Sequence, residues 1–492
     1  MNNIAFLKMS TYSVRISKIK ISNFKNTLNG EISLTNTRKN FKASVLGIYG
    51  QNGSGKTSLI EAINLLKFAL TGQQIPVVYS NYISVNSEQT DRKASFVFDF
   101  ELKNNTEVIP VSYSFSIKAE KVNNDNLPLQ NLTSSSLKVF VVDESLECPI
   151  YSAKADSKRK MGKALAIDPD EVLIPKCKKH LFAGNSPQAE TDLKVAKQLA
   201  YERSVSFLFS YGLIKIMRDR YNSNSLSVKD KSEFEYYYNL IESLISYGHT
   251  GLFVIRTASS GLLSLNIQTL NFKYNDGNTG ALGSISIPLN DSGLIPAEAL
   301  SVVTKVFSNL NIVLSKIIPG LTIDIRNLGE QILSDGNKGY RVQLMSQKNL
   351  QQIPLEYESE GIKKIISILQ LLIVVYNDPS TTVAIDELDS GIFEYLLGEI
   401  LSIVSENGKG QLIFTSHNLR PLETIDKSFI AFTTVNSNDR YVRATNVKST
   451  NNLRDIYFRN LMLDEYRDDL YEKTNNSEIA FAFREAGVNS GS

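Results

Sequence analysis

The chain has 492 residues, of which 42% are hydrophobic and 21% charged, which excludes bulk disorder and leaves room for roughly two to four domains. The 53 basic and 51 acidic residues give a net charge of only +2, so any affinity for nucleic acid must come from local patches. Two cysteines exclude a disulfide scaffold, no apolar run reaches the ~20 residues of a membrane helix, and no secretion signal is recognisable. We therefore expect a cytoplasmic protein that does not cross a membrane.

The first part of the chain predicts several strands and one helix. Residues 13–22 alternate apolar and polar side chains with one slip, as in a half-buried strand. Residues 45–49 form a short apolar run that suits a strand buried on both faces, and residues 58–70 follow with helical spacing. Further strands are predicted at residues 95–102, 108–118 and 137–142.

The middle of the chain is richer in helical patterns. Residues 188–220 and 232–246 combine helical apolar spacing with many charged and aromatic side chains. Residues 296–318 form another predicted helix, because Pro296 suits a first helical position and Pro319 stops the helix. Beyond it, strands are predicted at residues 321–328, 340–346, 383–385 and 411–415, and helices at residues 362–377 and 393–405.

This order of elements predicts an α/β fold in which one discontinuous domain is interrupted by an insertion. The two parts of that domain are residues 1–145 and 321–450. Between them, residues 146–320 are expected to form a mainly helical insertion domain, and residues 451–492 a C-terminal helical extension.

Residues 50–57 match the motif G-x-x-x-x-G-K-[ST] between a predicted buried strand and a predicted helix. Glycines let backbone N–H groups turn inward around phosphate oxygens, and the positive N-terminus of the helix points at the same anion. In such a loop Lys56 reaches the β- and γ-phosphates and the Thr57 hydroxyl binds Mg²⁺. The sequence therefore predicts a site for ATP and Mg²⁺, with the nucleotide contacted by Asn52, Gly53, Ser54, Gly55, Lys56, Thr57 and Ser58.

Two later apolar strands deliver further polar candidates. After residues 383–385, we expect Asp386 to bind Mg²⁺ and Glu387 to act on a water beside the γ-phosphate. One strand later stands His417, where a histidine can contact the γ-phosphate. Alone, an acidic pair is often a solvated strand end and a single histidine is often structural. Their position after the phosphate-binding motif favours Glu387 and His417 as catalytic residues.

A second anion site is predicted at the start of the helix at residues 362–377. Ser359 and Gly361 form a Ser-x-Gly sequence, in which the hydroxyl, the backbone and the helix N-terminus can bind phosphate, although an isolated example would be an ordinary helix cap. One chain cannot present this site and its own phosphate loop to one nucleotide if they lie on opposite edges of the sheet. The sequence therefore predicts a homodimer or higher homo-oligomer with ATP sandwiched between subunits.

In their order along the chain, these motifs resemble those of ABC-type ATPase heads of the RecF/SMC/OLD group. Residues 19–25 also resemble that group's first strand and Asn-Phe turn. The resemblance implies a two-lobed P-loop head whose Ser-x-Gly signature acts across a dimer interface, which residues 389–391 would cross. The Q-loop is unassigned, because Gln73 and Gln74 lie near its expected place without a clear motif.

Compact heads of this kind occur in bacterial anti-phage systems similar to PARIS, Septu and OLD-like systems. The resemblance implies a nucleotide-gated switch or sensor with a separate nuclease or toxin as effector, because the 75 residues after His417 show no TOPRIM acidic pattern. Two alternatives remain at this stage. One is a RecF-like DNA-repair ATPase that binds DNA directly, and the other is an ATP-dependent assembly scaffold with little hydrolysis.

Two segments have a composition that could contact nucleic acid. Residues 154–179 carry a local excess of lysine and arginine, which is more typical of a solvated loop than of a phosphate-backbone contact. Residues 236–238 are three consecutive tyrosines, for which we expect a place in the core of the insertion or in a partner interface rather than base stacking.

Overall fold

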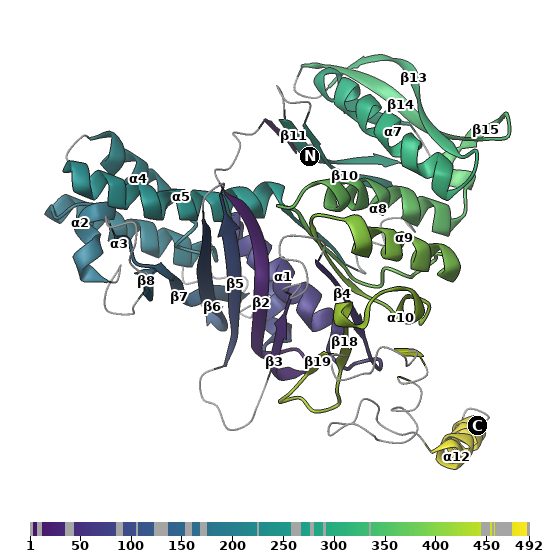
Figure 1. Cartoon of the computed structure of the whole chain (residues 1–492), viewed down its shortest axis with the longest axis horizontal. Coiled ribbons are helices and arrows are strands. Elements are labelled where there is room, and N and C mark those ends of the chain that lie inside the picture. The colour runs from purple at the N-terminus through teal and green to yellow at the C-terminus, as the bar shows by residue number, and fades with distance from the viewer. Residues whose placement is uncertain are drawn as a thin grey trace, which may run out of the picture.

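The centre of the molecule is a six-stranded sheet with the strand order β19-β18-β4-β17-β16-β9, here seen in a computed structural model (Figure 1). The parallel strands are β18 (Ile430–Thr433), β4 (Ser44–Tyr49), β17 (Gln411–Thr415), β16 (Thr382–Ile385) and β9 (Leu252–Ile255), and β19 (Tyr441–Arg443) is antiparallel. Every residue of β4, β16, β17 and β18 is buried, as the short apolar runs predict. The structure describes residues 3–6, 12–34, 44–84, 92–104, 107–122, 136–152, 160–167, 175–223, 226–256, 267–275, 280–288, 292–333, 336–443, 453–454, 457 and 475–489.

Hydrophobic cores lie on both faces of this sheet. On one face, Leu46 and Ile48 of β4 share a core with α1 (Lys56–Leu70). On the other face, Val45 and Tyr49 share a core with α8 (Glu360–Asn377) and α9 (Glu394–Asn407). Alternate side chains of one buried strand therefore serve two cores, and the layers run helix, sheet, helix. The predicted α/β fold is confirmed.

A second six-stranded sheet, entirely antiparallel, packs into the core that contains α1. Its strands are, in spatial order, β3 (Thr27–Ser33), β2 (Ser13–Phe24), β5 (Lys93–Lys103), β6 (Val108–Val122), β7 (Ser136–Pro149) and β8 (Met161–Ala166). Buried and half-buried side chains alternate along β5, so one face of the sheet is packed. The strands predicted at 13–22, 95–102, 108–118 and 137–142 all lie inside these elements.

Four helices extend from the antiparallel sheet to the left of Figure 1 and are called the helical arm below. They are α2 (Lys176–Phe182), α3 (Pro187–Glu202), α4 (Tyr211–Asn222) and α5 (Val228–Thr250). Tyr236 and Tyr237 are buried in its core, which confirms that interpretation of the tyrosine run. Lys178, from the predicted basic patch, is also buried and donates to the Tyr237 hydroxyl (2.9 Å). Residues 154–159 and 168–174 of that patch lie outside the described residues.

Glu144 of β7 fastens the helical arm to the antiparallel sheet. Its buried carboxylate accepts hydrogen bonds from the Tyr113 hydroxyl (2.7 Å) and from the backbone N–H of Phe207 (2.7 Å), where the chain passes between α3 and α4. Burial raises the pKa of Glu144, and these hydrogen bonds oppose that rise.

A second lobe lies above α8 in Figure 1. It contains β1 (Asn3–Phe6), β10 (Ile267–Asn275), β11 (Gly280–Pro288), β12 (Gly293–Pro296), α7 (Ala297–Ile317), β13 (Thr322–Ile332), β14 (Lys338–Lys348) and β15 (Gln351–Pro354). Helix α7 is the one described helix that is long and apolar enough to cross a membrane, and 33% of its apolar window is buried. Val303, Phe307 and Leu310 of α7 pack into the core shared with α8.

The segment predicted as one helical insertion, residues 146–320, is divided among four parts of this fold. It contains the helical arm, but also β8 of the antiparallel sheet, β9 of the central sheet and much of the second lobe. The limits predicted near 145 and 320 therefore do not coincide with the limits of these sheets. Strand β9 has four residues, too few for periodicity to reveal. Within residues 451–492, the structure has the helix α12 (Asn476–Asn489).

Candidate functional site

The loop between β4 and α1 carries the residues of the predicted phosphate-binding motif. Gly50 has a φ of 156°, and a Cβ at this position would lie 1.8 Å from Thr433 Oγ1, so the chain needs glycine here. The hydroxyl of Ser54 lies next to the same Thr433 hydroxyl and donates to the carbonyl of Gln51 (2.6 Å). Because α1 begins at Lys56, its N-terminus faces the loop.

The Lys56 side chain is held inside this loop and is 7% exposed. Its Nζ donates to the backbone carbonyls of Gly50 (2.7 Å) and Gln51 (2.9 Å). Burial lowers the pKa of Lys56, and the carboxylates of Asp386 and Glu387 oppose this. An ammonium group held in this way can exchange carbonyl partners for phosphate oxygens without a large movement.

Asp386 and Glu387 follow β16 and are both fixed by Thr415 at the end of β17. Oδ1 of Asp386 accepts a hydrogen bond from Thr415 Oγ1 (2.7 Å), and the same threonine oxygen accepts from the backbone N–H of Glu387 (2.7 Å). Glu387 has a φ of 50°, a left-handed conformation that is uncommon for a residue with a side chain. Asp386 Oδ1 also lies 3.4 Å from Thr57 Oγ1. Two oxygen donors this close suit Mg²⁺, which prefers oxygen ligands.

His417 stands on the loop beyond β17. Its backbone N–H donates to Oδ2 of Asp389 (3.1 Å), and the N–H of Asn418 donates to the same oxygen (3.0 Å). Asp389 therefore ties the loop after β16 to the loop that carries His417. The His417 side chain is exposed.

These residues surround one cleft of about 670 Å³ at the carboxyl edge of the central sheet. The sequence-predicted residues that line it are Asn52, Gly53, Gly55, Lys56, Thr57, Ser58, Asp386, Glu387 and His417. The structure thus brings together residues from positions 52 to 417. Ser54 is turned away and buried against Thr433, and neither Ser359 nor Gly361 lines the cleft.

The second wall of the cleft was missed by sequence reasoning. It includes Lys25, Asn26 and Tyr82, with Lys25 Nζ 4.4 Å from the centre of the Tyr82 ring. The side-chain oxygen of Asn26 accepts a hydrogen bond from the Ser58 hydroxyl (3.1 Å), which joins this wall to α1. The Asn-Phe turn at residues 23–24 could have indicated this wall in the sequence, because Lys25 and Asn26 follow it directly.

A brace behind the phosphate-binding loop was also missed, because no motif marks it. The Tyr441 hydroxyl donates to the backbone carbonyl of Gly55 (3.0 Å). Arg440 is buried beside the same glycine and donates to the carbonyls of Thr434 (2.6 Å) and Asn26. The C-terminal strand of the central sheet therefore supports the loop near the N-terminus.

Ser359 caps α8 through its hydroxyl, which accepts from the N–H of Ile362 (3.3 Å). A Cβ on Gly361 would lie 2.2 Å from the carbonyl oxygen of Gly391, so glycine permits a close backbone approach here. Two exposed aromatic side chains flank this contact, Tyr357 (72% exposed) and Phe393 (70% exposed). Ser359 is itself exposed.

Gln73 and Gln74 lie on the exposed turn that follows α1, at the opposite end of that helix from the phosphate-binding loop. They do not line the cleft. A 15-residue helix is about 22 Å long, which explains the separation.

Comparison with known proteins gives a family and several distant structures. A family model described as an AAA ATPase domain matches residues 15–420. One similar solved structure is the SMC head domain from Thermotoga maritima, with 15% identity and a TM-score of 0.36 over 87% of this chain and 98% of that chain. Another is the Smc head domain with a coiled coil and joint from Pyrococcus yayanosii, with 11% identity and a TM-score of 0.42 over 91% of this chain and 99% of that chain. The recombination mediator protein RecF-ATPrS of the RecFOR pathway is similar at 11% identity with a TM-score of 0.33, over 88% of this chain and 99% of that chain. A search of curated proteins found no match.

Proposed function

The chain belongs to the AAA ATPase domain family, and we propose that it binds ATP with Mg²⁺ in the cleft at the carboxyl edge of the central sheet and hydrolyses it. The observation that carries this proposal is the convergence of Lys56, Asp386 and Glu387 on one cleft from separate strand ends. A cation for phosphate, oxygen donors for a metal ion and a further carboxylate are the parts that phosphoryl transfer requires.

Each residue has a role that follows from its contacts. Lys56 exchanges its two carbonyl partners for oxygens of the β- and γ-phosphates, to which an ammonium forms charge-assisted hydrogen bonds. Thr57 and Asp386 hold Mg²⁺, which neutralises phosphate charge when it is bound. Lys25 and Tyr82 form the wall that is available to the rest of the nucleotide.

Glu387 orients the attacking water. Its backbone is anchored by Thr415, so the side chain is presented from a fixed point next to Asp386. His417 faces the same cleft from the neighbouring loop and contacts the γ-phosphate. Asp389 fixes the loop that carries His417, so that Glu387 and His417 keep the same position relative to each other.

The nucleotide site is completed by a second copy of the chain. Ser359 and the N-terminus of α8 lie outside the cleft of their own subunit, yet they have the composition of an anion site. Tyr357 and Phe393 add exposed aromatic surface at this position, which is typical of an interface. We propose that Ser359 of one subunit meets the γ-phosphate bound by the other.

In this proposal the ATP-bound dimer is a nucleotide-gated switch that works with a separate effector, as in the anti-phage systems that the motifs resemble. Support for this finer role comes from the motif set alone. Salt-dependent binding of duplex DNA by the purified chain would favour the RecF-like alternative instead.

The ATP site is tested by calorimetric titration of Lys56→Ala with Mg·ATP. We expect the affinity to fall about tenfold or more, because a charge-assisted contact to phosphate is lost. Lys18→Ala is the matched control, since Lys18 lies on β2 and pairs with Glu31 at the surface. Unchanged ATP affinity in Lys56→Ala would refute the proposed site.

A further inference from the structure

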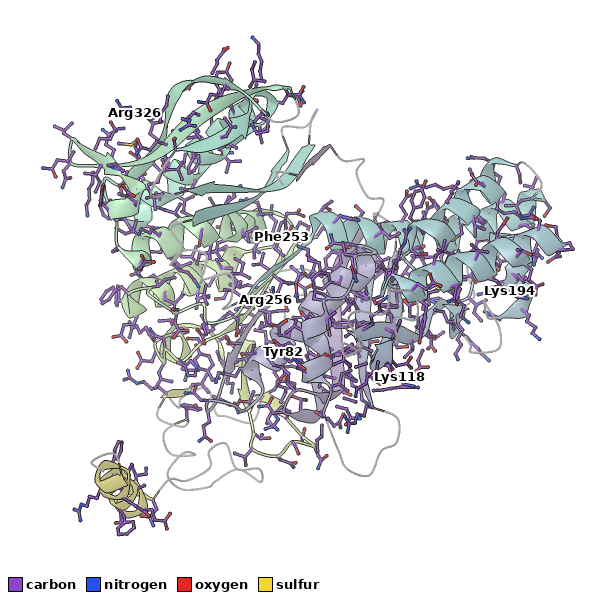
Figure 2. All side chains as sticks on the ribbon, turned by 180° about the vertical axis from the view of Figure 1, so that it is seen from behind. Tyr82, Lys118, Lys194, Phe253, Arg256 and Arg326 are labelled. Atoms are coloured by element: carbon purple, nitrogen blue, oxygen red, sulfur yellow. The ribbon has the colours of Figure 1, made fainter. Side chains whose placement is uncertain are left out.

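Helix α12 has an apolar face without a packing partner among the described residues. Ile479, Ala482, Phe483 and Ala486 recur at helical spacing and therefore lie on one side of the helix. Each of them is exposed, and Figure 1 and Figure 2 both show α12 standing apart from the sheets and the other helices. An isolated helix of 14 residues is only marginally stable in water, so α12 needs a surface that covers this face.

An open apolar groove of about 470 Å³ lies where the second lobe meets the helices of the central sheet. Its floor is the C-terminal half of α8, including Leu372 and Ile373, and its two sides come from α7 and α9. Ile403 of α9 lines the groove and is 56% exposed. Each side also carries one charged side chain, Lys316 on α7 and Glu399 on α9, and both are exposed. The groove thus offers apolar surface between a positive and a negative rim.

The charges beside the apolar face of α12 complement the two rims of this groove. On one side the face is bordered by Glu478 and Glu485, which are two helical turns apart and share an edge of the helix. Arg484 borders it on the other side. With the apolar face in the groove, the acidic edge meets Lys316 only when Arg484 meets Glu399. The charges therefore select one of the two directions in which α12 can lie along the groove.

The chain itself can bring these two surfaces together. Tyr457 stacks on Phe432 of β18, with 5.2 Å between the ring centres, and belongs to the core that contains α8 and α9. Eighteen residues separate Tyr457 from Asn476, and an extended chain of that length spans up to about 60 Å. A covalent link of this kind gives α12 an effective concentration of about a millimolar at its own groove. It therefore favours that groove over the same groove on another copy.

We propose that α12 docks into this groove of its own chain, with Ile479 and Phe483 as the apolar anchors. Amphipathic helices commonly enter a groove through anchors that are three or four residues apart. Docked there, α12 contacts α7 of the second lobe together with α8 and α9, and so ties that lobe to the central sheet. The groove uses the end of α8 that is remote from Ser359, so the proposed dimer surface stays free.

Hydrogen–deuterium exchange of the full chain, read by mass spectrometry, tests the proposal. The backbone amides of an undocked 14-residue helix exchange almost as fast as those of an unfolded peptide, whereas docking should slow their exchange about tenfold or more. Phe483→Ser removes an anchor, so we expect it to abolish most of this protection. Phe481→Ser is the matched control and should exchange like the parent chain, because Phe481 is 66% exposed on the opposite face of α12.

A charge exchange identifies the surface on which α12 lies. Glu485→Lys should lower the protection of α12 severalfold, and Lys316→Glu in the same chain should restore part of it, because the attraction is then reversed and not lost. If the second substitution restores nothing, α12 packs elsewhere and the proposal is wrong. It is equally wrong if α12 is unprotected in the parent chain, or if the two phenylalanine variants exchange alike. Protection that disappears when the protein is diluted would place α12 on another copy and overturn docking within one chain.

Discussion

The two regions proposed to bind phosphate differ in how much of a nucleotide site one subunit provides. At the phosphate-binding loop, Lys56 is buried, bonded to two carbonyls and braced from behind by Thr433 and Tyr441. At the start of α8, Ser359 is exposed, and so is the nearby side chain of Tyr357. The phosphate-binding loop is therefore fully ordered by contacts within one subunit. The second region has the composition of an anion site, but Ser359 and Gly361 lie outside the cleft that Lys56 lines.

In the proposed dimer the two regions have different roles. The phosphate-binding loop binds nucleotide within one chain, so its variants should change affinity. The start of α8 acts on the nucleotide of the neighbouring chain, so its variants should change turnover and assembly while affinity within one subunit is kept.

The largest effect is expected from Glu387→Gln. ATP binding should persist, because the carboxylate orients water and does not hold the nucleotide, while turnover falls on the order of 100-fold or more. Steady-state phosphate release and the fraction of dimer trapped with ATP measure the two effects. Turnover at the parent rate would refute the proposed role of Glu387 in orienting the water.

Gly361→Ala should have the next largest effect. The added Cβ would meet the carbonyl oxygen of Gly391 at 2.2 Å, so α8 or the loop after β16 must move. Overpacking of this kind costs ~1–3 kcal/mol, and we expect turnover to fall about tenfold with ATP affinity unchanged. A parent-like rate in a correctly folded variant would show that this close approach does not matter for turnover.

A smaller effect is expected from Phe393→Ser. Removal of an exposed aromatic from the proposed interface should weaken ATP-dependent dimerisation severalfold, about 1 kcal/mol, as measured by sedimentation. Phe483→Ser is the matched control, because Phe483 is equally exposed (77%) but lies on α12. If both variants dimerise equally well, the aromatic surface beside Ser359 is not part of the contact.

The parts of the site that could be predicted from the sequence are the residues that directly follow a strand in the chain. Residues 50–57, Asp386 and His417 are recognisable because a short motif follows an apolar strand. Tyr82 and Tyr441 reach the cleft and its loop only because sheets bring distant segments together, and no local pattern records that.

The central claim is that one nucleotide is shared by the loop of one subunit and Ser359 of another. Its most direct test mixes Ser359→Arg with Lys56→Ala, each of which we expect to be inactive alone at an ATP concentration that Lys56→Ala does not bind, and measures ATPase activity of the mixture. Arginine at 359 would fill the space next to the partner's γ-phosphate. In a mixed dimer one site carries both defects and the other carries neither, so we predict that partial activity returns. If mixed dimers form, as confirmed by mass, and the mixture stays inactive, the shared site is contradicted.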